Sequence, residues 1–490
     1  MAVNHTKENP IIVGLDIGTT KIAAIVAKRD KFGKLQILGV GKVPSHGVSR
    51  GVVTNIKHTT EAIIDAVAEA ERLSGFKVTS VYVGIAGQHI ASKQSRDIYT
   101  MDNPDEEITR MDIRQMIQNM NRIALEPGER IITVLPQEFS VDNNHGIIDP
   151  VGMCGSRLEA NFHIITGKVS EAQNIKKCVE KAGLKMAGLF LEPLASSAAV
   201  LHADELEAGV VLVDIGGGTT DIAIFKNKII RHTAVIPFAG NIITEDIMEG
   251  CKLLKPQAEK LKTSFGSALP SETHENEIIS IQGIAGRDRK EISMRTLAHI
   301  INARVEEIFT SVHFEIKSSG YVNSLNAGIV ITGGGSQLKH LKQLVEYTTG
   351  LSARIGYPTS YVSSNNKEEY KHPLFATGLG LVLEGYKSYD DMDMPERLEF
   401  YPELYIEIPE PQPVAEVIET VVVETPIVET SPINTDELAH EEVEDTRHVE
   451  VIMHDKKQPK PGLKNLLQDM EYKFKKWFVD DDAAKGDFDN

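Results

Sequence analysis

The first 90 residues alternate short apolar runs with one longer segment of helical periodicity. Three runs rich in β-branched residues, at 11–18, 21–28 and 35–43, predict a meander of three strands. Residues 57–74 follow and repeat apolar side chains at the spacing of a helix, so we expect a helix with one buried face. That face consists of Ala62, Ile63, Ala66, Val67, Ala70 and Leu73.

The same order of elements returns later in the chain. Residues 209–218 and 220–230 predict a hairpin, and residues 231–238 predict the third strand of a second meander. Asp16 and Asp214 end the first strands of the two copies, at an offset of 198 residues. A repeat of this kind predicts two similar lobes with a cleft between them.

The pattern changes again beyond residue 387. Residues 388–462 are rich in Pro, Glu, Thr and Val, and this composition predicts a disordered linker. Residues 463–479 return to helical spacing with lysines on the other faces, so we expect an amphipathic helix that lies on a membrane surface or docks on a protein partner. Its apolar stripe consists of Leu463, Leu466, Leu467, Met470, Phe474, Trp477 and Phe478. An acidic tail, 480–490, follows.

The charge of the chain limits its possible partners, and its cysteines indicate the compartment. The net charge of −18 is concentrated in the predicted linker, and the rest of the chain is close to neutral. A nucleic-acid-binding protein needs a basic face, so we expect no nucleic acid among the partners. The three cysteines, Cys154, Cys178 and Cys251, are far apart and fit a reducing cytoplasm better than a zinc site. Residues 1–10 predict a polar tail without the apolar core of a signal peptide.

The turns inside the two meanders carry the candidate chemistry. Each of them, 16–21 and 214–221, joins two strands and places an Asp before glycine and a Thr-Thr pair. Backbone N–H groups in such a turn bind phosphate oxygens, and glycine lets the backbone approach closely. One copy alone would equally suit a tight hairpin, but two matching copies favour phosphate binding. The candidate phosphate-binding residues are Gly18, Thr19, Thr20, Lys21, Gly216, Gly217, Gly218, Thr219 and Thr220.

A third glycine cluster lies at 328–341, where a strand ends and a helix is expected to begin near Ser336. A helix N-terminus beside glycines suits a nucleoside and its first phosphate. The candidate nucleoside-binding residues there are Gly333, Gly334, Gly335 and Ser336. The two turns do not have the spacing of a P-loop, and a strand follows each of them where a dinucleotide-binding loop would lead into a helix.

These three glycine-rich segments, in this order, resemble the two phosphate motifs and the adenosine motif of the actin, Hsp70 and sugar-kinase superfamily. Residues 192–198 and 376–380 are similar to its interdomain helices, whose small side chains allow a close crossing. The resemblance implies that ATP binds with Mg²⁺ and that Asp16, Asp214 and Glu192 hold the ion through water. It also implies that Glu192 orients the attacking water, which makes it the candidate catalytic residue.

The resemblance further assigns Glu259 and Lys262, which lie one helical turn apart, to the ribose and base of the nucleotide. A surface ion pair between residues i and i+3 is the alternative for these two side chains.

Within the superfamily the chain is similar to the FtsA family of bacterial cell-division proteins, through residues 45–56, 81–90 and 134–168. The resemblance implies an α/β, two-lobed, actin-like (ribonuclease-H-like) ATPase fold with an inserted subdomain, a disordered linker and a C-terminal amphipathic helix. The linker is longer and more acidic than that family leads us to expect. The implied divisions are a first lobe at 11–84 with 168–205 and 366–387, an inserted FtsA-type subdomain at 85–167, a second lobe at 206–240 with 301–365, and its upper subdomain at 241–300.

The family resemblance implies a cell-division protein that binds ATP, self-associates into filaments and hydrolyses ATP slowly or incidentally. Its expected partners are the tubulin-like protein FtsZ, later division proteins and the cytoplasmic membrane surface, where the terminal helix would hold it peripherally at the division site. A sugar or acetate kinase of the same fold is the main alternative, but it needs an acceptor pocket for which we find no motif. An Hsp70-like chaperone would need a β-rich peptide-binding domain, which the acidic linker is unsuited to form.

Overall fold

The computed structural model of the protein describes residues 10–274, 276–283, 288–363, 366–392, 394–401 and 450–453. The amphipathic helix expected at 463–479, the acidic tail at 480–490 and nearly all of the N-terminal tail lie outside the described residues. The chain divides into two compact units, Met1–Thr273 with Arg295–Asp445, and His274–Met294 with Thr446–Asn490. None of the helices in these described ranges combines the length and the apolar composition that spanning a bilayer requires.

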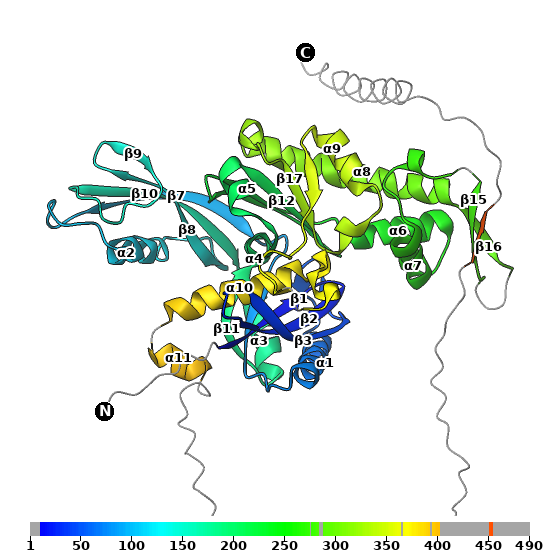
Figure 1. Ribbon diagram of the computed structural model, residues 1–490, viewed down its shortest axis with the longest axis horizontal. Helices are drawn as coiled ribbons and strands as arrows, with labels where there is room; N and C mark the ends of the chain where they lie inside the picture. Colours follow the sequence, from blue (N-terminus) through cyan, green and yellow to red (C-terminus); the bar gives the residue numbers. More distant parts are fainter. Residues whose placement is uncertain are drawn as a thin grey trace, which may run out of the picture. The chain divides into compact units, whose positions relative to one another are not determined.

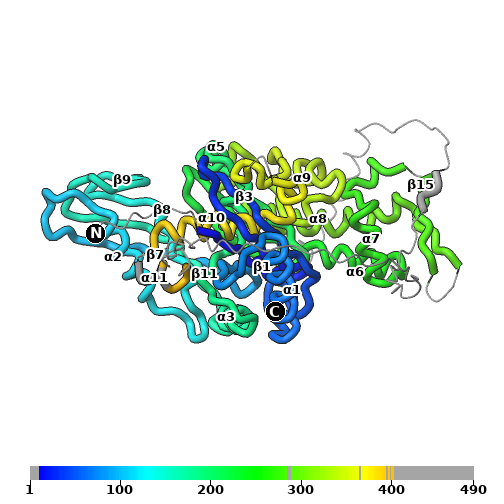
Figure 2. The backbone as a smooth tube through the Cα atoms, turned by 60° about the horizontal axis from the view of Figure 1, so that its bottom comes forward, coloured from blue at the N-terminus to red at the C-terminus, as the bar shows by residue number. Residues whose placement is uncertain are grey.

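The first lobe is built on a five-stranded sheet in the order β11-β6-β1-β2-β3. Its strands are β1 (Ile11–Ile17), β2 (Lys21–Arg29), β3 (Leu35–Pro44), β6 (Ser80–Ile85) and β11 (Lys185–Leu191). The first three form the predicted antiparallel meander, and β6 and β11 continue the sheet in parallel. Helices α1 (Ile56–Ser74) and α3 (Val169–Lys181) pack side by side against this sheet (Figures 1 and 2).

Helix α1 confirms the predicted periodic segment and shows where its apolar face ends. The Asn55 side chain caps its first turn by accepting a hydrogen bond from the His58 N–H at 3.1 Å. Gly75 ends the helix in the left-handed conformation, at φ 76°. Five of the six predicted apolar positions are buried, but Leu73 is 43% exposed. Leu73 lies in the last turn, beside the Gly75 cap, so the buried face ends at Ala70.

The second lobe repeats the strand order of the first. Its sheet runs β14-β13-β12-β17-β18, again as an antiparallel meander extended by two parallel strands. The strands are β12 (Val210–Ile215), β13 (Thr220–Lys226), β14 (Ile229–Ile236), β17 (Ile329–Thr332) and β18 (Ala353–Ile355). The internal repeat expected from the sequence is therefore a duplicated sheet topology.

One boundary in this meander differs from the prediction. The sequence pattern extended the second strand to residue 230, whereas β13 ends at Lys226. Asn227 and Lys228 both take positive φ, at 55° and 65°, and form a two-residue turn. Such a turn matches the twist of a hairpin, so the chain reverses before Ile229 and the apolar pair at 229–230 opens β14 instead.

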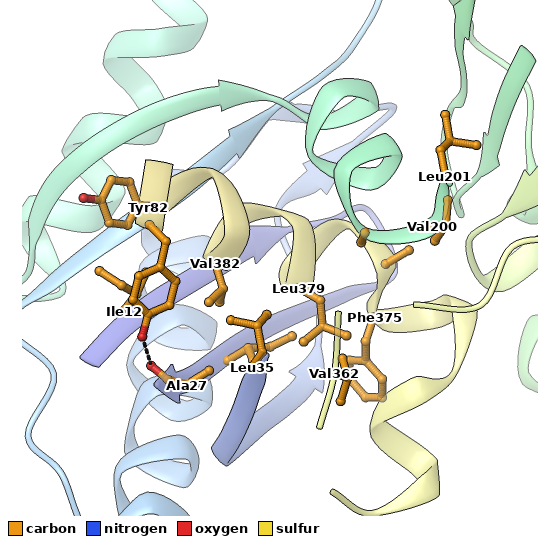
Figure 3. Close-up of a cluster of buried hydrophobic side chains, with 14 of the residues drawn as sticks. Ile12, Ala27, Leu35, Tyr82, Val200, Leu201, Val362, Phe375, Leu379 and Val382 are labelled. Carbon is orange, nitrogen blue, oxygen red and sulfur yellow. Dashed lines mark hydrogen bonds between the residues drawn. The ribbon is translucent and has the colours of Figure 1, made fainter. Parts of the chain in front are cut away.

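Two helices, α4 (Glu192–Val200) and α10 (Ala376–Asp391), cross between the sheets of the two lobes. A Cβ atom placed on Gly380 would lie 1.8 Å from the Ala195 carbonyl oxygen, so only glycine allows the two backbones to approach this closely. A single buried cluster joins both sheets through these helices. In Figure 3, Leu379 and Val382 of α10 lie in that cluster beside Leu35.

Helix α10 runs past the predicted linker boundary at 388, and α11 (Met394–Phe400) follows it. The Tyr401 hydroxyl then donates to the Tyr82 hydroxyl at 3.0 Å, and both side chains are buried. The first residues of the range predicted as a disordered linker therefore belong to the first lobe.

Residues 91–168 form a separate subdomain inserted between β6 and α3. Its four-stranded antiparallel sheet has the order β7-β10-β8-β9. The elements are β7 (Ala91–Thr100), α2 (Arg110–Met120), β8 (Glu129–Val141), β9 (Asn144–Ile147) and β10 (Arg157–Lys168). The subdomain has an apolar core of its own, to which α2 contributes Met116 and Met120. Figure 1 shows it as a distinct body of strands and one helix.

The remaining elements of the first unit are helices and short turns. The helices are α5 (Ala203–Ala208), α6 (Gly240–Cys251), α7 (Lys255–Phe265), α8 (Met294–Ser318, whose first residue falls in the second unit) and α9 (Leu341–Thr349). A short hairpin joins β4 (Val48–Ser49) to β5 (Val52–Val53). The 3₁₀ turns lie at Pro270–Glu272, Val322–Ser324, Gly334–Gln337, Glu368–Lys371 and Pro373–Phe375.

The second unit is a small antiparallel sheet in the order β16-β15-β19. Its strands are β15 (Glu277–Ile281), β16 (Lys290–Ser293) and β19 (Glu450–Met453). Strand β19 falls inside the range predicted as a disordered linker. It forms because the backbone of β15 supplies the hydrogen-bonding partners that an isolated strand lacks.

Candidate nucleotide-binding site

The two predicted phosphate loops are hairpin turns of the same construction. In the first, between β1 and β2, the Gly18 N–H donates to the Lys21 carbonyl at 3.0 Å. In the second, between β12 and β13, the Gly216 N–H donates to the Thr219 carbonyl at 2.9 Å. Each turn follows a strand that is buried throughout or, in β1, from its second residue onward, and carries its Asp at the strand end. The duplicated sheet therefore presents two equivalent loops.

The two loops meet face to face. A Cβ atom on Gly217 would lie 1.8 Å from Thr20 Oγ1, and one on Gly218 would lie 2.6 Å from Thr19 Oγ1. Glycine is required at both positions because any side chain would push the loops apart. The structure thus brings the sequence-predicted Thr and Gly residues of both copies into one place.

The leading aspartates are buried at this meeting point. Asp16 is 4% exposed and forms an ion pair with Lys21. Asp214 is 7% exposed and accepts hydrogen bonds at Oδ2 from Ser196 Oγ at 2.5 Å and from Thr377 Oγ1 at 3.2 Å. Ser196 and Thr377 belong to α4 and α10, so the crossing helices hold the second loop's carboxylate. Sequence analysis did not assign these two hydroxyls to the site.

Glu192 lies beside the same carboxylates, at the point where β11 ends and α4 begins. A Cβ atom on Gly84 of β6 would lie 2.7 Å from Glu192 Cγ, which shows how closely the side chain packs on the first lobe's sheet. Burial raises the pKa of Glu192 well above its usual value, and the charges of Asp16, Asp221 and Asp214 raise it further. Burial likewise raises the pKa of Asp214, with the charge of Asp16 adding to it.

Asp221 is a site residue that the sequence reasoning missed. It is 5% exposed; its Oδ2 accepts from Thr219 Oγ1 at 3.1 Å, and its Oδ1 has no hydrogen-bond partner among the described residues. Burial, followed by the charge of Asp214, raises its pKa to about 8. A signal was present, because the residue after the Thr-Thr pair is Lys21 in the first loop and Asp221 in the second.

The pair assigned to the ribose and base lies on α7. Lys262 Nζ is 2.7 Å from Glu259 Oε2, so the i,i+3 ion pair considered as the alternative is present. Lys262 also donates to the Gly240 carbonyl and to Thr244 Oγ1, both at 2.8 Å, and Thr244 bonds to Glu259. Burial lowers the pKa of Lys262, opposed by the charge of Glu259.

This pair is connected to the second phosphate loop through α6. The Gly240 N–H donates to the Gly216 carbonyl at 3.1 Å, and the Asn241 N–H donates to the Gly217 carbonyl at 2.8 Å. The pair therefore occupies a partly buried position beside the loop. Its assignment to the nucleoside stays a prediction.

The third glycine cluster borders Asp214. Gly333 has φ 81°, and a Cβ atom there would lie 2.2 Å from Asp214 Oδ1. Ser336 is buried and donates to the Gly333 carbonyl at 2.7 Å. The expected helix start near Ser336 is wrong: a 3₁₀ turn occupies Gly334–Gln337 and α9 begins at Leu341. His340 takes φ 61° between them, which interrupts the helix.

A segment that the sequence analysis used only for the family resemblance, 45–56, also crosses the loops. The Ser45 N–H donates to the Thr20 carbonyl at 3.0 Å, and the Gly51 N–H donates to Thr19 Oγ1 at 3.1 Å. A Cβ atom on Gly218 would lie 2.9 Å from Arg50 Cα. Arg50 is exposed beside both loops and adds a positive charge that the motifs did not indicate.

Four acidic side chains and one lysine lie together where the two loops meet. Among the described residues, no group of three or more His, Cys, Asp or Glu side chains is placed to ligate a metal ion. Asp16, Asp214, Glu192 and Asp221 nevertheless gather four carboxyl groups in a buried place, beside the amine of Lys21. The role of the first three as water-mediated Mg²⁺ ligands stays a prediction.

Comparison with known proteins agrees with this geometry. A chain from the PilM–PilN type IV pilus biogenesis complex superposes with a TM-score of 0.57 at 15% sequence identity, covering 77% of this chain and 99% of that chain. The duplicated sheets, the facing loops and the crossing helices define a protein of the two-lobed, actin-like ATPase fold.

Sequence comparison identifies the family. The model of the cell division protein FtsA matches residues 211–380, and that of the SHS2 domain inserted in FtsA matches residues 87–166. The cell division protein FtsA of Pseudomonas aeruginosa is 40% identical over 381 residues, covering 78% of this chain and 90% of the relative. The cell division protein FtsA of Escherichia coli K12 is 34% identical over 389 residues, which cover 78% of this chain and 92% of that relative. The chain belongs to the FtsA family of bacterial cell-division proteins.

Proposed function

We propose that this protein binds ATP between its two phosphate loops and uses it to control self-association in cell division. The observation that carries the proposal is the approach of Gly217 and Gly218 to Thr20 and Thr19. This approach brings the Thr19 and Thr20 hydroxyls against the backbone of the second loop, beside four acidic side chains. Phosphate binding uses such backbone donors, and the facing loops take them from both lobes. A bound nucleotide would fix the angle between the lobes.

The residues present fit a Mg²⁺ ion bound with the triphosphate. When bound, the ion would neutralise phosphate charge and favour the ionised forms of nearby carboxylates. Asp16 and Asp214, one from each lobe, would hold its water shell, and Glu192 would orient the attacking water. Without the ion the pKa of Glu192 is well above normal, so this residue holds its proton more firmly than a free glutamate.

We further propose that the protein tethers a ring of the tubulin-like protein FtsZ to the cytoplasmic face of the membrane and helps to recruit later division proteins. Family membership supports the partner, and the amphipathic pattern at 463–479 supports the anchor. The kinase alternative is not favoured, because the relatives that cover this chain are cell-division proteins.

Liposome co-sedimentation tests the tether. The full chain should pellet with liposomes of anionic and neutral phospholipid and bring purified FtsZ with it. A chain ending at Gly462 should bind FtsZ but stay in the supernatant with it, because it lacks the apolar stripe. A full-length variant that carries both Trp477→Ala and Phe478→Ala tests the apolar stripe itself. It should pellet less with liposomes while still binding FtsZ. If the shortened chain pellets as well as the full one, the anchor proposal is wrong.

A further inference from the structure

The inserted subdomain is attached to one lobe and docked on the other. Its chain enters from β6 through residues 86–90 and leaves β10 at Lys168 directly into α3, and both flanking elements belong to the first lobe. Strands β7 and β8 nevertheless lie against β14, the edge strand of the second lobe's sheet. The subdomain therefore bridges the two lobes beside the crossing helices.

Three polar contacts make this docking specific, and we call them the β14 contact. Arg231 Nη2 is 2.6 Å from Glu138 Oε1. Gln137 Nε2 donates to the Ile230 carbonyl at 2.9 Å. His163 Nε2 and Thr233 Oγ1 are 3.3 Å apart. Each contact pairs one residue of the inserted subdomain with β14.

The groups in the β14 contact are largely withdrawn from water, apart from the Glu138 side chain, which is 39% exposed. The Arg231 side chain is 8% exposed and lies 5.8 Å from the centre of the Tyr321 ring, a cation–π distance. Gln137 is 8% exposed and His163 is 1% exposed. A buried guanidinium that loses its carboxylate is costly. Small displacements of β14 should therefore carry the subdomain along, because opening the contact would leave Arg231 unpaired.

The same strand leads back to the phosphate loop. β14 pairs with β13 along its length, so that Ile236 lies opposite Thr220 and Val235 lies opposite Asp221. The Thr220 hydroxyl also donates to the Phe238 carbonyl at 2.7 Å. Thr220 and Asp221 belong to the second phosphate loop, and Arg231 is a few residues further along the paired strand.

We propose that β14 couples the nucleotide loops to the inserted subdomain, so that closing the lobes moves the subdomain relative to the first lobe. The movement would take place at its two connections, where Gly87 has φ 121° and Gly167 precedes Lys168. Arg231 and Glu138 are positioning residues, because they hold the inserted subdomain on β14 and touch no nucleotide. The inference rests on the proposed function, because it takes nucleotide to be the ligand that closes the lobes.

Hydrogen exchange of the full chain tests the coupling. The exchange of amides in 129–141 and 157–168 is measured with and without a saturating non-hydrolysable ATP analogue and Mg²⁺. In the natural protein the nucleotide should change exchange in these strands about fivefold or more, the lower range of allosteric coupling. Arg231→Met should remove this nucleotide-dependent difference while the protein still binds the analogue. Arg231→Lys should keep most of it, because it retains a charge within reach of Glu138.

The control variant is Lys228→Met in the turn between β13 and β14, which removes an exposed ion pair with Glu207 of α5. It should behave as the natural protein does. If Arg231→Met proves unstable, Gln137→Met removes a β14 contact from the other side and should also remove the difference. The proposal is overturned if Arg231→Met keeps the full response, or if Lys228→Met loses it too.

A separate titration of the analogue distinguishes the two proposals. If the natural protein binds the analogue but shows no exchange difference in the subdomain, the coupling is wrong and the nucleotide site stands. If it does not bind the analogue, the proposed function fails and the coupling fails with it.

Discussion

At the scale of a single residue, Asp221 shows how a buried carboxyl in the site makes the stability of the folded protein depend on pH. Its carboxyl is buried, Oδ1 has no partner among the described residues, and its pKa is raised from 3.8 to about 8. An acid with a higher pKa in the folded state binds more protons when folded. Its contribution to stability therefore falls as the pH rises from the unfolded toward the folded pKa. For Asp221 this window runs from about 4 to about 8.

We predict that the nucleotide-free protein unfolds at a lower temperature at pH 8 than at pH 5.5. Asp221→Asn keeps the shape of the side chain but removes its proton equilibrium, so this variant should lose much of that difference. The linked free energy is about 1.4 kcal/mol for each unit of pKa shift. Thermal unfolding followed by circular dichroism across this pH range measures it. The exposed Asp65→Asn should unfold as the natural protein does, and an unchanged pH dependence in Asp221→Asn would contradict the account.

Individual site residues differ in how far the sequence predicts them. The loop glycines and threonines could be proposed from the sequence because each motif is local and occurs twice, and the structure brings the two copies together. Ser196 and Thr377 were not assigned to Asp214, because they come from helices about 180 residues apart in sequence that meet only through packing. Nothing near either hydroxyl in the chain indicates its partner.

At the scale of elements, the crossing of α4 and α10 determines how the lobes are joined. The small residues at 192–198 and 376–380 predicted a close crossing, and Gly380 accounts for it by its approach to the Ala195 carbonyl. We predict that Gly380→Ala destabilises the protein by about 1–3 kcal/mol, the usual cost of overpacking. Lys387→Ala, on the exposed side of α10, should change stability by less than about 0.5 kcal/mol.

The midpoint of urea unfolding measures the stability of both variants. The affinity of each variant for nucleotide is measured as well. Equal midpoints for Gly380→Ala and the natural protein would mean that the helices can move apart freely. That result would contradict a crossing held by backbone contact.

Element boundaries were harder to predict than the elements themselves. The end of β13 was misplaced because the polar Asn227 and Lys228 were included in one strand with the apolar residues on either side, although Asn tolerates the positive φ of a two-residue turn. The start of α9 was misplaced because the glycine cluster resembles a helix N-terminus. The positive φ of His340 is not helical, so the helix begins only after this residue. In both places the apolar and glycine pattern did not reveal the residue that takes a positive φ.

For the whole molecule, duplication of the sheet is the feature on which the site depends. Two copies of one meander place two copies of one loop at equivalent strand ends, and the shared apolar cluster through α4 and α10 turns them toward each other. The sequence predicted this because the repeat is visible in the loops. It did not predict the β14 contact, since the inserted subdomain and β14 share no motif.

The measurement that tests the central claim most directly is the affinity of the full chain for a fluorescent ATP analogue with Mg²⁺, in the natural protein and in Gly217→Val. A valine there would force Thr20 and the second loop apart, so the affinity should fall by about 100-fold or more, as expected when positioned phosphate donors are lost. Gly320→Asn, at a left-handed glycine with open space around it, is the control and should bind normally. If Gly217→Val folds and binds the analogue as tightly as the natural protein does, the nucleotide does not lie between these loops.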